Sequence, residues 1–141
     1  MRNRAFIVVA LAAAAAAAEA QRPAYVVIAN PATAASRLDR KFVGEAFLRR
    51  VTRWPDDTPI HPVDLGPDAR ARIRFSEEVL SRTVASVRSY WQQRIFSGQG
   101  LPPPELGDDE AVVSYVLSHA GAIGYVAAGT ALNGAKVLEL N

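Results

Sequence analysis

The sequence of 141 residues contains no cysteine and only two histidines. The missing cysteines exclude disulfide bonds, thiolate zinc sites, thiol catalysis and a lipid anchor attached through an N-terminal cysteine. His61 and His119 lie far apart in the sequence, so a helical i, i+4 pair of metal ligands is also excluded. We therefore expect no metal or other cofactor, and a fold held together by its hydrophobic core alone.

Motifs that would support catalysis are equally scarce. Asp64, His61 and one of the serines could be combined as a triad, but no nucleophile-elbow pattern surrounds any serine. Both histidines are explained more simply as surface residues or as partners of a helix end. Trp54 and Trp91 fit core packing better than a ligand platform. We expect a protein that is not an enzyme.

Long apolar runs are confined to the N-terminus. A basic head, Met1 to Arg4, precedes the alanine-rich run from Ala5 to Ala18, and Ala18-Glu19-Ala20 matches a signal peptidase site. The alternative is a membrane anchor, but alanine is weakly apolar and the run is short for a span. The sequence predicts a signal peptide at residues 1–20, a domain at residues 21–141 and export to the periplasm.

Negative charge and lysine are scarce in the middle of the chain. Residues 37–94 carry 12 basic and 8 acidic side chains, and 14 of the 16 basic residues in the whole chain are arginines. A solvated, arginine-rich surface explains this pattern, whereas a small anion or an acidic partner stays open as an alternative. The pattern has no nucleic-acid-binding signature, so no nucleic acid partner is expected.

Apolar segments of two kinds alternate along the rest of the chain. Short β-branched runs predict strands at residues 24–30, 60–65, 121–129 and 136–140. Helical spacing predicts helices after Ser36, after Pro67, over residues 83–97 and after Asp108. Pro62 predicts an edge position for the second strand. The order of elements indicates an α/β domain, with a mixed sheet flanked by helices.

Four segments in this order carry a resemblance to a known family. They are VVIANP, FVGEAFLRRVTRWPDDTPIHPVDL, RIRFSEEVLSRTVASVRSYWQQRIFSGQGLPPP and GAIGYV. Together they closely resemble the phosphate ABC transporter substrate-binding-like proteins, the single-lobe relatives of periplasmic phosphate-binding proteins. The resemblance implies a single-lobe, periplasmic-binding-protein-like domain of type II, export in a Gram-negative cell, and a link to phosphate uptake.

The chain departs from this family at the residues expected to hold phosphate. Two-lobed relatives use Ser-Gly-Thr at a helix N-terminus, with an arginine just upstream. Counted back from Phe75, these places are taken here by Ala69, Arg70, Ala71 and, upstream, a position near Leu65. The glycine of the family's Phe-Leu-Gly pattern is replaced by Arg49. The resemblance therefore implies that phosphate binding is weak or lost.

Two groups of residues are candidates for binding an anion. Arg70 and Arg72 lie at the start of the helix after Pro67, where free N–H groups and arginine donors suit phosphate. Asp68 competes with an anion there, because its carboxylate could cap the same N–H groups. Thr33 and Ser36 precede the first helix, and ordinary capping is their alternative role.

These observations predict a non-enzymatic, exported solute-binding-like protein with weak or lost affinity for phosphate or another small anion. The alternative is a periplasmic interaction module that docks on a membrane or signalling partner. A single lobe cannot close on a ligand as two hinged lobes do.

Overall fold

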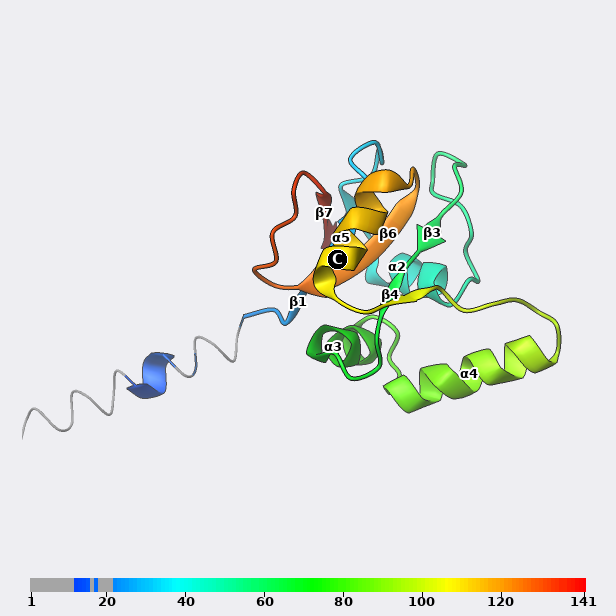
Figure 1. Cartoon of the computed structure of the whole chain (residues 1–141), viewed down its shortest axis with the longest axis horizontal. Coiled ribbons are helices and arrows are strands. Elements are labelled where there is room, and N and C mark those ends of the chain that lie inside the picture. Colours follow the sequence, from blue (N-terminus) through cyan, green and yellow to red (C-terminus); the bar gives the residue numbers. More distant parts are fainter. Residues whose placement is uncertain (1–11, 16, 18–21) are drawn as a thin grey trace, which may run out of the picture.

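The computed structural model describes residues 12–15, 17 and 22–141, and Figure 1 shows their arrangement. The predicted signal peptide, residues 1–20, lies largely outside these residues and stays a prediction. Among the described residues, no helix has the length and apolar character needed to cross a membrane. The strands are β1 (Tyr25–Ala29), β2 (Arg37–Leu38), β3 (His61–Pro62), β4 (Asp64–Leu65), β5 (Glu105–Leu106), β6 (Ala122–Ala127) and β7 (Lys136–Leu140). The helices are α2 (Arg40–Phe47), α3 (Arg70–Glu78), α4 (Val84–Phe96) and α5 (Asp109–Ser118).

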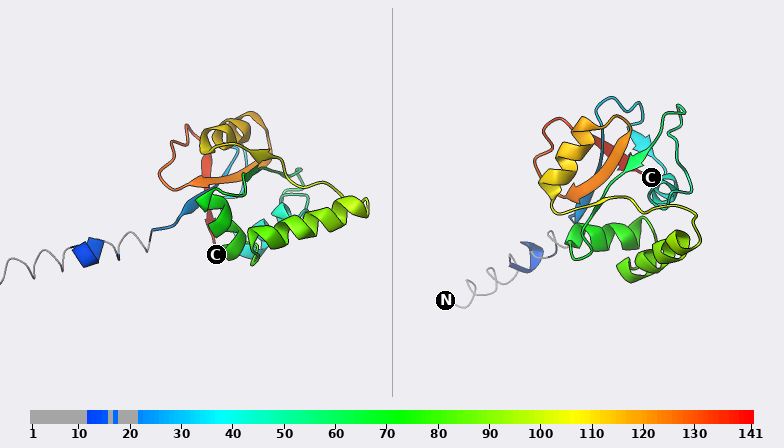
Figure 2. Two further views of the ribbon diagram at one scale, coloured as in Figure 1. Left: turned by 60° about the horizontal axis from the view of Figure 1, so that its bottom comes forward. Right: turned by 45° about the vertical axis from the view of Figure 1, so that its right-hand side comes forward.

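The sheet is mixed, as the sequence predicts. Its strand order is β2-β7-β1-β6-β3, with β1 antiparallel to both β6 and β7. β3 runs parallel to β6 and β2 runs parallel to β7, while β4 and β5 form a separate parallel pair. Figure 2 shows α5 over one face of the sheet and α3 on the other face. The architecture is therefore an α/β domain with helices on both sides.

The predicted strand at residues 60–65 is divided into β3 and β4. Val63 N–H still bonds to the Ile123 carbonyl at 2.9 Å, but Asp64 N–H bonds to the Pro104 carbonyl at 2.8 Å. The chain thus leaves the main sheet after Val63 and pairs with β5 instead. β3 is an edge strand, which agrees with the expected place of Pro62.

The first helix begins later than the sequence predicts. Arg37 and Leu38 form β2, and the N-cap of α2 is Asp39, without a side-chain capping hydrogen bond. Ser36 therefore does not cap a helix, and its carbonyl instead accepts the N–H of Glu139 at 2.9 Å. Pairing with β7 satisfies the backbone of this segment in place of a helical turn.

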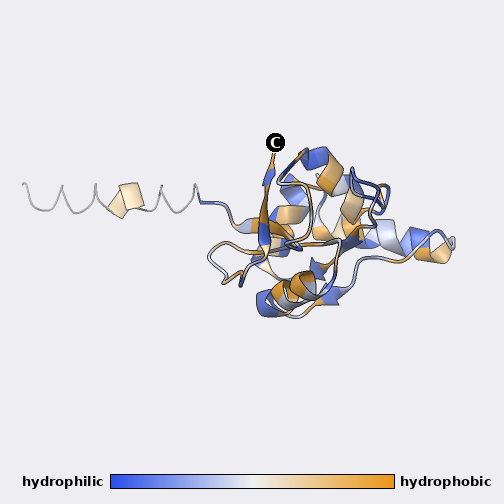
Figure 3. Ribbon diagram, turned by 90° about the horizontal axis from the view of Figure 1, so that it is seen from above, coloured by the Kyte–Doolittle hydropathy of each residue, from blue (hydrophilic) through white to orange (hydrophobic). Residues whose placement is uncertain are grey.

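Helix α4 reaches away from the sheet. Thr83 caps it by accepting the N–H of Ser86 at 3.1 Å, and only Val87 and Trp91 are fully buried. Ile95, which continues the four-residue spacing of Val87 and Trp91, is 48% exposed, and Phe96 is 96% exposed. Figure 3 shows the apolar C-terminal end of α4 far from the rest of the domain. The apolar residues at helical spacing are thus buried only in the first part of this helix.

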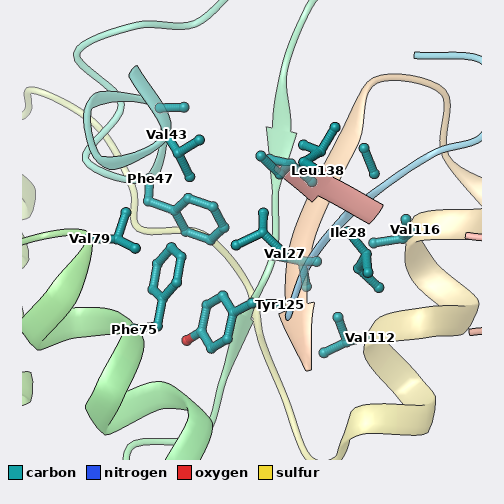
Figure 4. Close-up of a cluster of buried hydrophobic side chains, with 14 of the residues drawn as sticks. Val27, Ile28, Val43, Phe47, Phe75, Val79, Val112, Val116, Tyr125 and Leu138 are labelled. Atoms are coloured by element: carbon teal, nitrogen blue, oxygen red, sulfur yellow. The ribbon is translucent and has the colours of Figure 1, made fainter. Parts of the chain in front are cut away.

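The core lies on both faces of the sheet, as Figure 4 shows. On one face, α5 packs Val112 and Val116 against β6. On the other, Phe75 stacks on Tyr125 with ring centroids 4.0 Å apart, and Phe47 contacts Phe75 edge-on at 4.7 Å. This aromatic cluster fixes α3 against β6, because it buries large rings from both elements.

Candidate functional site

The turn from Gly66 to Ala69 carries the chain from β4 into α3, where the first candidate site was expected. The N-cap of α3 is Ala69, and no side chain caps the helix. Asp68 is exposed and does not accept the N–H groups of the first turn, so the expected self-capping is wrong. A charged side chain, that of Arg72, nevertheless lies about one turn further along the helix.

Arg72 points into the protein. Its side chain is 5% exposed, and Nη1 donates to the Leu65 carbonyl at 2.7 Å and to Glu105 Oε1 at 3.2 Å. The same nitrogen lies 3.3 Å from Asp64 Oδ1. The Nη1 donors of Arg72 are therefore engaged by groups of the protein itself. This differs from the open guanidinium fork that binds phosphate in two-point contact.

Asp64 is the buried partner of Arg72, and its carboxylate also accepts the hydroxyl of Tyr125. Tyr125 Oη in turn accepts the N–H of Leu65 at 3.4 Å. Burial raises the pKa of Asp64 to about 6, against the lowering effects of Arg72 and the Tyr125 hydrogen bond. Burial, and then the nearby Asp64 charge, raise the pKa of Tyr125 as well. Asp64, Tyr125 and Arg72 thus form a network of interacting ionisable groups in the interior of the domain.

Arg70 does not join this network. It is exposed at the first position of α3, and no ion pair to it is formed by the part of the chain described here. Residues two positions apart on a helix face different directions, so the structure does not bring the side chains of Arg70 and Arg72 together. The structure places one of the two arginines in solvent and the other in the core.

A small hollow of about 170 Å³ adjoins Arg72, lined in part by Pro67, Trp91, Pro102 and Glu105. The Nε of Arg72 has no hydrogen-bond partner among the described residues. Glu105 lines the hollow together with Arg72, so an anion that entered it would also meet a carboxylate. The negative charge of this carboxylate repels an anion and so disfavours its binding in the hollow.

Thr33 and Ser36 lie in a different part of the molecule. Thr33 lines a hollow with Gly121, next to the start of β6, and its carbonyl accepts the Nζ of Lys136 at 2.7 Å. Its Oγ1 is buried without a hydrogen-bond partner within the described residues. Ser36 is exposed beside β7. The structure therefore does not bring the two pairs of candidate residues together.

The histidines and tryptophans take the ordinary roles expected of them. His119 is exposed and stacks on Tyr115 with ring centroids 3.9 Å apart, and His61 is exposed in β3. Trp54 is buried and donates its indole N–H to the Gly121 carbonyl at 3.0 Å. No group of three or more potential metal ligands occurs among residues 12–15, 17 and 22–141.

Sequence reasoning did not find Tyr125 and Glu105 as members of the site, and it considered Asp64 only for a triad. The single signal was the acidic Asp64 inside an apolar strand pattern. A buried carboxylate needs a donor or a positive partner, and the sequence could not show which residue supplies it.

No family model and no curated protein sequence matches the chain. Solved structures do. The chain is similar to a Clostridium perfringens protein described as a phosphate ABC transporter substrate-binding protein, with phosphate bound, at a TM-score of 0.63 and 16% identity over 83% of this chain. An ABC-type phosphate transport receptor from Vibrio cholerae matches 83% of the chain at a TM-score of 0.60 and 15% identity. PstS from Borrelia burgdorferi matches 84% at a TM-score of 0.59 and 14% identity.

The chain has a periplasmic-binding-protein-like fold. It spans 44%, 46% and 47% of the length of those three structures, which agrees with the predicted single lobe. The fold class and the resemblance expected from the sequence are thus confirmed at the level of the fold. The similarity to substrate-binding proteins supports a related solute-binding fold for this chain.

Proposed function

We propose that this chain is an exported, non-enzymatic solute-binding-like domain whose affinity for phosphate at the start of α3 is weak or lost. One observation carries the proposal. The Nη1 of the buried Arg72 lies 3.3 Å from Asp64 Oδ1 and 3.2 Å from Glu105 Oε1. Two carboxylates of the protein thus already pair with the arginine that would otherwise bind an anion.

Three further features support the proposal. The similar structures are substrate-binding proteins, one of them with phosphate bound, but this chain covers less than half of that one's length. The hydroxyl-bearing residues that the family resemblance implies are replaced by Ala69 and Ala71. Export rests on the predicted signal peptide at residues 1–20. A single lobe needs a second body to enclose a ligand, which is why tight capture by this chain alone is not expected.

The thermal midpoint of the purified protein tests the proposal. It is measured with chloride, sulfate or phosphate at 10 mM and at matched ionic strength. A ligand with a Kd of about 1 mM would stabilise the native state by about 1.4 kcal/mol at this concentration, so binding of that strength is visible. We expect no phosphate-specific shift in the wild type. A saturable shift at micromolar phosphate contradicts the proposal.

The double variant Asp64→Asn/Glu105→Gln gives the complementary measurement. It removes both carboxylates beside Arg72 and leaves a buried positive charge, so it should gain a phosphate-dependent stabilisation. The matched control is Glu110→Gln/Glu139→Gln, which removes two exposed carboxylates elsewhere and should gain none. Equal behaviour of the two double variants would reject the role given to Asp64 and Glu105.

A further inference from the structure

A basic cleft lies between α2 and the junction of α3 with α4, apart from the site at Arg72. Its volume is about 600 Å³. The basic residues that line it come from α2 and its C-terminal end and from the α3–α4 junction, and they are Arg40, Lys41, Arg50 and Arg82. We call this feature, together with Tyr90 and Arg94 beside it, the basic cleft.

The positive charge of the basic cleft is poorly compensated. Of the carboxylates that line it, Glu78 is already engaged by the Tyr25 hydroxyl at 2.8 Å and by Arg74. Glu45 reaches Arg50 only at 3.4 Å. Within the described part of the chain, no carboxylate forms an ion pair with the remaining cations of the basic cleft, Arg40, Lys41, Arg82 and Arg94. Such a group of unpaired cations attracts anionic partners.

Tyr90 gathers three of these arginines. The guanidinium carbons of Arg50, Arg82 and Arg94 lie 5.4, 5.2 and 5.3 Å from the centroid of its ring. The Tyr90 hydroxyl donates to the Leu48 carbonyl at 2.8 Å, which ties α4 to the C-terminal end of α2. The ring therefore holds the arginines near one another, against their mutual repulsion.

Two of these arginines lie in a regular row with Tyr90 along the chain, from just before α4 to its last turn. Arg82, Ser86, Tyr90 and Arg94 follow one another at intervals of four residues, and Arg82 Nη1 lies 3.5 Å from Ser86 Oγ. Arg82 lies just before the N-cap Thr83 of α4, and its guanidinium meets those of Arg50 and Arg94 around the Tyr90 ring. The cleft extends from these arginines to Arg40 and Lys41 on α2, and its volume of about 600 Å³ is more than one phosphate ion fills, so it suits a segment of peptide better.

We propose that the basic cleft is a docking site for an extended, acidic segment of a partner protein. Carboxylates of that segment would pair with the arginines held at Tyr90 and with Arg40 and Lys41 at the α2 side. Arginine suits this role because its planar fork binds a carboxylate through two hydrogen bonds while its face stays on the aromatic ring. The site does not depend on phosphate binding at Arg72, so either proposal can fail without the other.

Binding of a fluorescent octaglutamate peptide to the full chain tests the inference by anisotropy. We expect saturable binding at low ionic strength, no binding of octaglutamine, and about a ten-fold loss of affinity between 50 and 300 mM NaCl. Absence of octaglutamate binding at 50 mM NaCl overturns the inference. So does full displacement by 10 mM phosphate at matched ionic strength, which would make the cleft a small-anion site.

Double variants that each remove two positive charges show where on the protein the peptide binds. Arg50→Gln/Arg82→Gln should lower the affinity about ten-fold, and Arg40→Gln/Lys41→Gln should also weaken it while leaving the contacts of Tyr90 intact. The control is Arg53→Gln/Arg88→Gln, which removes two exposed cations outside the cleft and should change the affinity less than about two-fold. Equal losses in the control and cleft variants would show non-specific attraction and overturn the site.

Discussion

The carboxylate of Asp64 lies 3.3 Å from the guanidinium of Arg72, and the two side chains are 8% and 5% exposed. Asp64 is the first residue of β4, which begins where the chain has left the main sheet, and Arg72 lies near the start of α3. The pair joins β4 to α3 at the helix end that was a candidate anion site. Its charges, rather than a ligand, balance each other there.

The first prediction concerns pH. Because the pKa of Asp64 is raised to about 6, the native state keeps a proton that the unfolded chain releases near pH 4. The free energy of unfolding should therefore fall as the pH rises from about 4 to about 6, by up to about 3 kcal/mol, and this contribution should be constant above that range. Urea unfolding at several pH values measures it.

Asp64→Asn is the control for this pH effect, because other carboxylates titrate in the same range. Asp56, for example, has a lowered pKa through its hydrogen bonds from Thr58 and acts with the opposite sign. The difference between wild type and Asp64→Asn should contain the fall between pH 4 and 6. A difference that is flat across this range would show that Asp64 has an ordinary pKa.

Removing the arginine of the pair should be costly. Arg72→Met leaves the ionised Asp64 buried without its partner, so we expect a loss of about 3 kcal/mol at pH 7. The loss should be smaller at pH 4.5, where Asp64 is protonated and needs no counter-charge. Arg70→Met, at the exposed neighbouring arginine, should change stability by less than about 0.5 kcal/mol. Equal effects of the two changes would contradict the burial of Arg72.

Arg49 offers a route to greater stability. It follows the C-cap of α2 with φ of 57°, in the left-handed region that favours glycine, and the family resemblance places a glycine there. Arg49→Gly should raise the free energy of unfolding by about 1 kcal/mol, seen as a higher thermal midpoint. Thr52→Gly, at an exposed position without positive φ, should bring no gain.

Gly124 should not tolerate a side chain. A Cβ at this position would lie 2.8 Å from Val112 Cγ1 and 3.0 Å from Val63 Cγ1, between β6 and α5. Gly124→Ala should therefore cost about 2 kcal/mol in chemical unfolding, because the core must shift to admit the methyl group. Gly107→Ala, where a Cβ meets no atom within 4 Å, is the control and should be close to neutral. Similar costs at both glycines would refute the close approach of α5.

Local patterns in the sequence predicted much of the fold. The β-branched runs that became β1 and β6 are nearly continuous because both strands lie inside the sheet and are covered on both faces. The Thr83 and Asp108 positions set the starts of α4 and α5 through side-chain caps, which act over three residues and are visible in the sequence. The ordered resemblance to phosphate-binding relatives supplied the fold class.

The site depended on contacts that no local pattern records. Arg72 was a candidate for binding an anion, but its partners include Glu105, which only the crossing of the chain from α4 to β5 brings close. Ser36 precedes a strand rather than a helix because β7, about a hundred residues later, pairs with the residues that follow it.

Residue types and spacing thus determined where strands and helices form, because burial of one face follows the local period. Only the tertiary structure decided which charges are buried together and which remain free. Asp64 and Arg72 neutralise each other inside the domain, whereas Arg50, Arg82 and Arg94 gather around Tyr90 at the surface. Electrostatic energy depends on distance in space and on exclusion of water, and a linear sequence specifies neither.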